Sequence, residues 1–304
     1  MSHQSLTADL CRAARRARGK QANLTYKARE QALARFSRFL WESGYQIHIT
    51  KQLREKHLRA WRADMAERDL SKRTVANNLA HIRTALEGIK RRHFADKMSN
   101  AALGASGSSR KGTKAPLPET DLTNFLLEAL AADRGVAMVL ELQHQFGLRA
   151  AEAVCSVTSL ADWHRALSNP IGDGFITVVH GTKGGKTRRS PPLDQHRAVQ
   201  LVAQAMALCA EQSGKLVRKA TFKDAMSRYH YVVRKIGMKG EQAPHSLRYS
   251  YATEHLRRMK ATGVSRHQAA AGVSTWLGHG DGRGTWVMLV YGQSALGSGE
   301  DQNA

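Results

Sequence analysis

Residues 244–292 carry three short polar motifs, PHSLR at 244–248, WLGH at 276–279 and VYG at 290–292, set among apolar helical stretches. His245 and Arg248 are three residues apart, which places both side chains on one face of a helix. Pro244 fixes the backbone entry angle of such a helix, and the Ser246 hydroxyl can cap its free N–H groups. The positive end of a helix attracts anions. We therefore expect a helix that begins near Ser246 and presents these two side chains to an anion such as a phosphodiester.

A His-x-x-Arg pair alone occurs by chance in any basic protein, so the remaining motifs matter. Upstream, FGLRAAE at 146–152 places Arg149 after a glycine break and at the start of a new helix. Between the two arginines, HGTKGGKTR at 180–188 is typical of a hairpin tip that carries lysines. Downstream, the WLGH motif that contains His279 is followed by Tyr291.

In this order the motifs resemble the tyrosine recombinase (phage integrase) family, over about residues 121–292. The family pattern is an arginine in a Gly-Leu-Arg-x-x-Glu turn, a lysine on a β-hairpin, His-x-x-Arg, Leu-Gly-His, and a tyrosine near the C-terminus. The resemblance implies a catalytic set formed by Arg149, Lys183, His245, Arg248, His279 and Tyr291. One departure is that residues 280–284 lengthen the loop between the second histidine and the tyrosine, so the path of this loop is open.

Phosphodiester chemistry explains these residue types. Charge grows on the phosphate as a fifth oxygen approaches phosphorus, and the guanidiniums of Arg149 and Arg248 can each donate two parallel hydrogen bonds to it. The departing 5′-oxygen needs a proton, which the resemblance assigns to Lys183. The alternative is that Lys183 and Lys186 both simply contact phosphates.

A tyrosine hydroxyl has a pKa of about 10 and is a weak nucleophile at neutral pH. It needs a base or a positive field, which two nearby histidines can supply. The resemblance implies that His245 assists proton transfer, that His279 positions the phosphate, and that Tyr291 attacks phosphorus. The alternative for Tyr291 is an aromatic anchor of a C-terminal helix, since Trp286 and other apolar residues surround it.

The chain has 304 residues, a formal net charge of +22 and a pI near 10.4, which favours a polyanionic partner. It has no apolar run long enough to cross a bilayer and no secretory signal. Three scattered cysteines fit a reducing cytoplasm, with the protein associated with the nucleoid. No Walker loop, carboxylate cluster or His-Cys ligand spacing is present, so we expect neither a cofactor nor a metal.

We expect a mainly α-helical protein, with an N-terminal all-helical domain and a C-terminal mixed α/β domain that has a small antiparallel sheet. The predicted boundaries are a helical domain at 1–98, a flexible basic Gly/Ser linker at 99–118 and a second domain at 119–304. The resemblance implies that the first is a DNA core-binding domain and the second the catalytic domain. Residues 5–19 have little apolar face and suit either a basic arm along a phosphate backbone or a solvated helix. Within 25–44, helical spacing predicts a core stripe that includes Trp41.

In the C-terminal part, we expect helices at 120–130 and 135–146, with Glu152 holding Arg149 or its turn. The β-rich residues 175–179 predict a strand, and residues 188–193 are interpreted as the return strand of a hairpin whose tip is 182–187. Further helices are expected at 194–212 and 221–236.

The resemblance implies a site-specific DNA recombinase or integrase that cleaves and rejoins double-stranded DNA through a 3′-phosphotyrosyl intermediate. The resemblance implies a homo-tetramer on paired sites, DNA-bending accessory proteins and a role in a mobile genetic element. Two alternatives stay open: a type IB topoisomerase, which shares the chemistry, and a non-catalytic DNA-binding protein.

Overall fold

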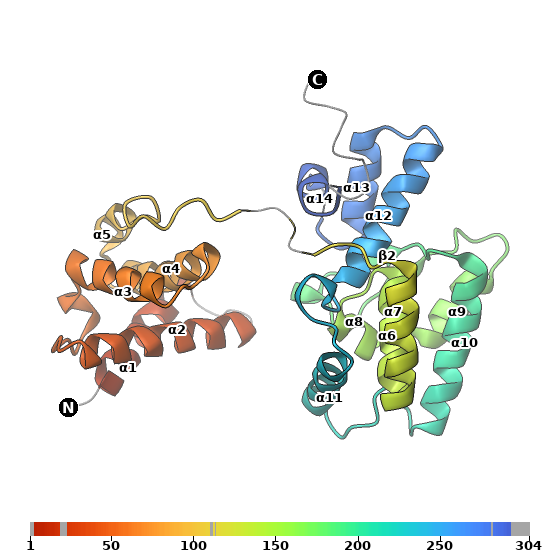
Figure 1. Ribbon diagram of the computed structural model, residues 1–304, viewed down its shortest axis with the longest axis horizontal. Coiled ribbons are helices and arrows are strands. Elements are labelled where there is room, and N and C mark those ends of the chain that lie inside the picture. Colours follow the sequence, from red (N-terminus) through yellow and green to blue (C-terminus); the bar gives the residue numbers. More distant parts are fainter. Residues whose placement is uncertain (1–2, 19–22, 110–111, 113, 281, 293–304) are drawn as a thin grey trace. The chain divides into compact units, whose positions relative to one another are not determined.

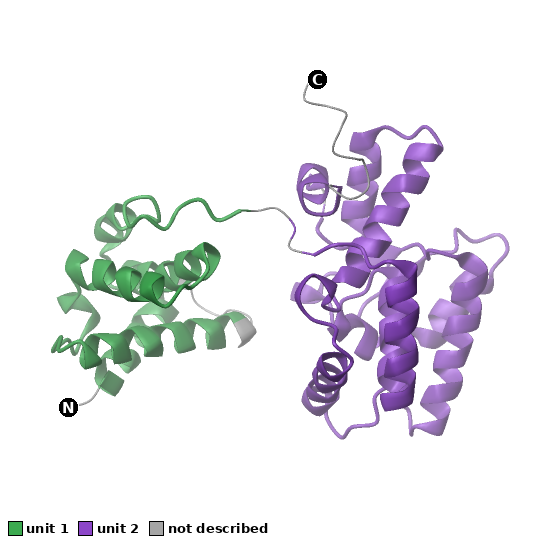
Figure 2. Ribbon diagram, in the orientation of Figure 1, with its two compact units in different colours: residues 1–109 green, residues 110–304 purple. Residues whose placement is uncertain are grey.

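The computed structural model describes residues 3–18, 23–109, 112, 114–280 and 282–292. The chain divides into two compact units, residues 1–109 and 110–304, which are described separately below (Figure 2). The described residues form mainly helices and one two-stranded antiparallel sheet (Figure 1). The expected fold class is therefore confirmed.

The secondary-structure elements in the described part of unit 1 are all helices. Its elements are α1 (His3–Arg18), α2 (Asn23–Glu42), the short helix Thr50–Gln52, α3 (Glu55–Glu67), α4 (Lys72–Gly88) and α5 (Arg92–Lys97). Ser71 caps α4 through a hydrogen bond from the backbone N–H of Thr74. Phe36 and Trp61 are buried at the centre with tilted rings, whereas Trp41 is 42% exposed. The prediction that Trp41 belongs to the core stripe is wrong, because Leu40 next to it already points inward.

Helix α1 is a core helix. Its residues Leu6, Leu10, Ala13 and Ala14 are buried, and α1 packs mainly against α4. A Cβ atom at Gly88 would collide with the carbonyl oxygen of Ala13, so the two helices touch backbone to backbone there. Neither the free basic arm nor the solvated helix predicted for this segment is correct. The apolar face was missed because much of it is made by alanine, which gives a weak periodic signal.

The chain after α5 still belongs to unit 1. Met98, Leu103 and Ala105 are buried in the same hydrophobic cluster as the helices. The guanidinium of Arg62 donates a hydrogen bond of 3.0 Å to the Gly104 carbonyl oxygen. The first half of the segment 99–118 therefore contributes to a packed core, and the domain limits drawn from the sequence stay a prediction.

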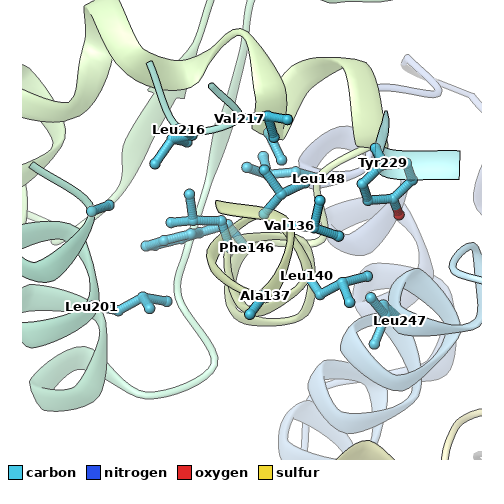
Figure 3. Close-up of a cluster of buried hydrophobic side chains, with 14 of the residues drawn as sticks. Val136, Ala137, Leu140, Phe146, Leu148, Leu201, Leu216, Val217, Tyr229 and Leu247 are labelled. Atoms are coloured by element: carbon cyan, nitrogen blue, oxygen red, sulfur yellow. The ribbon is translucent and has the colours of Figure 1, made fainter. Parts of the chain in front are cut away.

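Unit 2 is arranged around one buried helix. Its elements are α6 (Glu119–Ala132), α7 (Arg134–Phe146), α8 (Ala150–Val154), α9 (Leu160–Ser168), β1 (Ile176–Val178), β2 (Arg188–Ser190), α10 (Gln195–Glu211), α11 (Phe222–Lys235), α12 (Ser246–Ala261), α13 (Arg266–Trp276) and α14 (Gly284–Tyr291). Helix α7 is apolar on several sides, and Val136, Leu140 and Phe146 lie among side chains of α10, α11 and α12 (Figure 3). Burial of this kind stabilises the fold by about 1.5–3 kcal/mol per large side chain.

The sheet is the predicted hairpin. Ile176 pairs with Ser190, and Val178 pairs with Arg188, in an antiparallel register. The side chains alternate, so that Arg188 and Ser190 face inward while Arg189 faces outward. The indole of Trp163 in α9 donates a 2.7 Å hydrogen bond to the Thr177 carbonyl oxygen and fixes the hairpin on the unit.

Helices α12, α13 and α14 share a second hydrophobic cluster with Leu193. Helix α12 begins at Ser246 as expected, but the Ser246 hydroxyl is buried and does not cap it. The prediction of a serine cap is therefore wrong. The first turn is instead closed by backbone bonds, such as that from the Arg248 N–H to the His245 carbonyl oxygen at 3.1 Å.

Within the described residues, no helix is both long and apolar enough to span a bilayer.

Candidate active site

Arg149 lies in the short turn between the end of α7 and the start of α8. Gly147 ends α7 in the left-handed region with a φ of 60°, and a Cβ atom there would lie 2.6 Å from the Tyr251 ring. Only glycine fits that conformation and that space. Arg149 then precedes α8, and its backbone N–H donates a 2.7 Å hydrogen bond to Oε2 of Glu152. The glycine break thus sets the direction in which the arginine leaves the backbone.

Glu152 is the anionic centre of the site. It is 1% exposed and lies 2.7 Å from Nη1 of Arg149, 2.9 Å from Nη2 of Arg188 and 3.9 Å from Nη1 of Arg248. Burial alone would raise the pKa of this carboxyl, but Arg188, the Arg149 backbone N–H and Arg248 together lower it. The expectation that Glu152 holds Arg149 agrees with these bonds.

Arg248 is completely buried, although it carries a charge. Its Nη1 donates to the Gly147 carbonyl oxygen and its Nη2 donates to that of Leu277 at 2.7 Å. Its Nε is buried without a hydrogen-bond partner among the described residues. Burial, and then repulsion by Arg149 and Arg188, lowers the pKa of Arg248 to about 10, so it stays protonated at neutral pH.

The Leu-Gly-His turn is attached to the arginines by its backbone. The Leu277 carbonyl oxygen accepts from Arg248 and, at 3.4 Å, from Nη2 of Arg149. Gly278 has a φ of 69°, and a Cβ atom there would lie 2.8 Å from Cδ of Arg188. The motif therefore needs glycine for both conformation and space, and the turn delivers His279 to the same place as the arginines.

Tyr291 and His279 meet at the end of this turn. Nε2 of His279 is 3.3 Å from the Tyr291 hydroxyl, and the tyrosine is 1% exposed. Trp286 contacts both rings, with its centroid 4.3 Å from that of His279 and 5.8 Å from that of Tyr291. Tyr249 contacts Tyr291 from another side, at 4.5 Å between ring centroids. The longer loop does not prevent the contact, because α14 begins at Gly284, which lies close to the α13 backbone.

Both histidines of the site are neutral near pH 7. Partial desolvation lowers the pKa of His279 to about 3, with Arg248 and Arg149 adding to the shift. Partial desolvation followed by Arg248, Arg149 and Lys114 lowers the pKa of His245 to about 4. An unprotonated ring nitrogen can accept a proton from a neighbouring hydroxyl, so the cluster combines fixed cations with neutral bases.

Lys183 stands apart from the other five predicted residues. It lies in a short turn at the exposed hairpin tip, where Gly184 and Gly185 have positive φ. Among the described residues, no hydrogen bond or ion pair joins Lys183 to the arginines, the histidines or Tyr291. The structure thus brings together Arg149, His245, Arg248, His279 and Tyr291 and leaves Lys183 at the tip.

Comparison with protein families identifies this arrangement. Residues 1–108 match the family model described as "Phage integrase, N-terminal", and residues 104–254 match the one described as "Integrase".

The chain belongs to the phage integrase family.

Solved integrases share the fold. The Tn1549 transposon integrase in complex with a circular intermediate DNA matches with a TM-score of 0.61 at 17% identity, over 93% of this chain and 94% of that one. A lambda integrase dimer bound to a COC′ core site gives 0.57 at 14% identity, over 98% and 80%. A lambda integrase tetramer bound to a Holliday junction gives 0.54 at 15% identity, over 92% and 76%. No curated protein sequence matches the chain. At these identities the likeness extends to the fold alone.

Arg188 of this phage integrase is a site residue that was not predicted from the sequence. The signal that could have identified Arg188 is its place on the return strand of the hairpin. There it lies opposite Val178 on the inward face, and a buried arginine must find a partner. Trp286 was considered only as packing, yet it contacts the rings of both His279 and Tyr291. Its position five residues before Tyr291 on an apolar helix gives no sequence signal for that contact.

In the described part of this integrase, no three His, Cys, Asp or Glu side chains are grouped so that they could hold a metal ion. The acidic member of the site, Glu152, is already bonded to arginines.

Proposed function

We propose that this integrase is a site-specific DNA recombinase that cuts and rejoins duplex DNA through Tyr291. The proposal is supported above all by one observation: the Tyr291 hydroxyl lies 3.3 Å from Nε2 of His279, beside two arginines that bind the same turn. A phenol, a neutral base and fixed guanidiniums together are what attack on a phosphodiester requires.

In the proposed reaction the Tyr291 oxygen attacks phosphorus and its proton passes to Nε2 of His279. Arg149 and Arg248 stabilise the charge that accumulates on the non-bridging oxygens. The bond between phosphorus and the 5′-oxygen breaks, and the 5′-oxygen takes a proton from Lys183. The products are a 3′-phosphotyrosyl diester and a free 5′-hydroxyl. Attack by another strand's 5′-hydroxyl reverses the steps and joins the strands without a further energy source.

The geometry favours roles for the two histidines that differ from those implied by the family pattern. His279 contacts the nucleophile, and its lowered pKa keeps the ring unprotonated near neutral pH. His245 lies at the N-terminal end of α12, near Arg248 and Arg149. We assign His245 to the phosphate and His279 to the tyrosine proton.

Lys183 can act as the acid only when the hairpin tip reaches the scissile phosphate. The tip is exposed, and a Cβ atom added at Gly184 or Gly185 would meet no other atom within 4 Å, so nothing around those glycines blocks such an approach. A duplex that covers the tip would draw the lysine toward its phosphates. Because Lys183 approaches only with the duplex, it stays away from Tyr291 until DNA is bound.

The large positive charge supports a duplex partner, and the DNA complexes of the lambda and Tn1549 integrases support the same partner for this chain. We propose that it assembles as a tetramer on paired sites, as the lambda integrase does on a Holliday junction. Helical unit 1, with Arg12, Arg15 and Arg16 exposed on α1, is proposed to bind the same duplex as unit 2.

Covalent capture tests the function without knowledge of the target site. The protein is incubated with a library of random duplexes that carry one nick, and DNA that stays attached in detergent is sequenced. A nick beside the scissile phosphate lets the short 5′-hydroxyl strand diffuse away, so the adduct accumulates. We expect wild type to enrich a family of related sequences and Tyr291→Phe to capture none.

Absence of any adduct with wild type, or equal capture by Tyr291→Phe, would refute the proposal. A supercoiled plasmid that lacks the enriched sequence separates the recombinase from a topoisomerase. Efficient relaxation of that plasmid would favour the topoisomerase.

A further inference from the structure

Arg188 is a buried charge outside the set that the family pattern names. Its side chain is only 3% exposed, whereas the next residue on the strand, Arg189, faces outward. A solvated surface therefore does not explain why position 188 is basic. Burial of an unpaired charge costs several kcal/mol, so the fold must compensate for Arg188 with specific bonds.

The bonds of Arg188 converge on three groups. Its Nη2 lies 2.9 Å from Oε2 of Glu152 and 3.4 Å from the Gly147 carbonyl oxygen. Its Nε donates a 2.6 Å hydrogen bond to the Trp276 carbonyl oxygen. Its Nη1 is buried with no partner among the described residues. One planar guanidinium therefore joins the β2 strand to the α7–α8 turn and to the end of α13.

Two of these three groups also hold an arginine of the proposed active site, and the third lies next to a carbonyl oxygen that holds both. Glu152 binds Nη1 of Arg149, and the Gly147 carbonyl oxygen accepts from Arg248. Trp276 directly precedes Leu277, whose carbonyl oxygen accepts from both arginines. Arg188 thus supports the same backbone turns that orient Arg149 and Arg248.

Arg188 also supports the turn that leads to His279. Cδ of Arg188 would lie 2.8 Å from a Cβ atom at Gly278, so the turn rests on the arginine's aliphatic chain. Arg188 further adds to the positive field that lowers the pKa of His279. A lysine at 188 could keep one bond to Glu152 but could not form the fork that reaches Trp276 as well.

We propose that Arg188 is a positioning residue for strand cleavage: it fixes Glu152 and the 276–278 turn, so that Arg149, Arg248 and His279 face one phosphate. The inference rests on the proposed function. Arg188 itself does not contact DNA in this proposal, and it differs from the surface cations that would add affinity.

The test compares Arg188→Lys with Arg189→Lys, its neighbour on the outward face of β2, whose side chain is 55% exposed and paired with Asp173. The substrate is the duplex that wild type captures covalently. Two quantities are measured: the dissociation constant before cleavage, and the rate of adduct formation at saturating protein. Arg188→Met, which lacks both charge and fork, is the second variant, and thermal unfolding verifies that each variant is folded.

We expect Arg188→Lys to bind the duplex within about twofold of wild type and to form the adduct about 100-fold more slowly, because a misplacement of about 1 Å can cost that much. Arg189→Lys should match wild type in rate. A normal rate for Arg188→Lys, or a loss of binding as large as the loss of rate, would overturn the inference. If one Arg188 variant does not fold, the other decides by the same criterion.

A second readout needs no DNA. The ring signals of His279 are assigned in a histidine-labelled NMR spectrum by comparison with His279→Gln. They should shift in Arg188→Lys and stay unchanged in Arg189→Lys, and unchanged signals in both variants would count against Arg188. If wild type forms no adduct at all, the proposed function fails, while this measurement still decides whether Arg188 positions His279.

Discussion

Replacing Glu152 by glutamine removes the one carboxylate that the structure pairs with three arginines in the described part of unit 2. In the folded protein, Glu152 accepts close hydrogen bonds at 2.7 Å from Arg149 and 2.9 Å from Arg188, and a third arginine lies at 3.9 Å. Glutamine keeps one acceptor but presents an N–H donor to a guanidinium. Removal of one partner from a buried ion pair costs about 3–5 kcal/mol. We expect Glu152→Gln to lower the free energy of unfolding of unit 2 by about that amount.

Glu254 provides a matched control, since it also binds two arginines, Arg257 at 2.6 Å and Arg258 at 2.7 Å, but its side chain is 31% exposed. Exposed ion pairs contribute about 0–1 kcal/mol. Hydrogen exchange of α7 and α8 peptides in increasing urea reports the stability of unit 2 without unit 1. Equal small losses for Glu152→Gln and Glu254→Gln would refute the argument that burial makes Glu152 essential.

The pH dependence gives the same prediction a second check. The folded-state pKa of Glu152 lies below its ordinary 4.5, so its contribution is complete above that value and is lost as the pH falls through the folded pKa. The stability difference between wild type and Glu152→Gln should therefore be constant near neutral pH and shrink below about 4.5.

Three further predictions follow from single contacts. Gly278→Ala, where Cβ would press on Arg188 at a φ of 69°, should abolish adduct formation, whereas Gly263→Ala, at a φ of 78° with no atom within 4 Å, should cost only about 1 kcal/mol of stability and leave the adduct rate unchanged. The NMR ring signals of His279 should not titrate between pH 8 and pH 5, because its pKa is lowered to about 3; a midpoint near 6.5 would contradict the described burial. Gly88→Ala should lower the melting temperature of unit 1 more than Gly44→Ala, and equal melting of the two variants would exclude the close contact of α1 with α4.

Local sequence predicted much of unit 2. Helices near 120–130, 135–146, 194–212 and 221–236 follow from strong 3.6-residue periodicity, and the hairpin follows from the β-branched run at 176–179 and the glycine-rich tip after it. In unit 1, α1 was misjudged because alanines form much of its buried face. The periodic signal there comes mainly from Leu6 and Leu10, and the close backbone contact at Gly88 cannot be read from α1 itself.

The composition of the site was readable from motifs, but its connections were not. Arg149, Arg248 and His279 share short motifs with local spacing. The hydrogen bonds that join them are accepted by the carbonyl oxygens of Gly147, Trp276 and Leu277. Every residue has such a carbonyl, so the sequence does not indicate which ones accept. The Ser246 cap failed for the complementary reason: serine is common at helix starts, but tertiary packing buries this hydroxyl.

Chemical labelling of the hairpin tip can report whether DNA occupies the site. Lys183 is exposed in the free protein, whereas Arg248 and Tyr291 are shielded by the rest of unit 2. An amine-acylating reagent should therefore label Lys183 in the absence of nucleic acid, and a duplex seated over the tip should protect it. Mass-spectrometric footprinting of this one lysine would then report occupancy of the site in the Tyr291→Phe protein, where no turnover takes place.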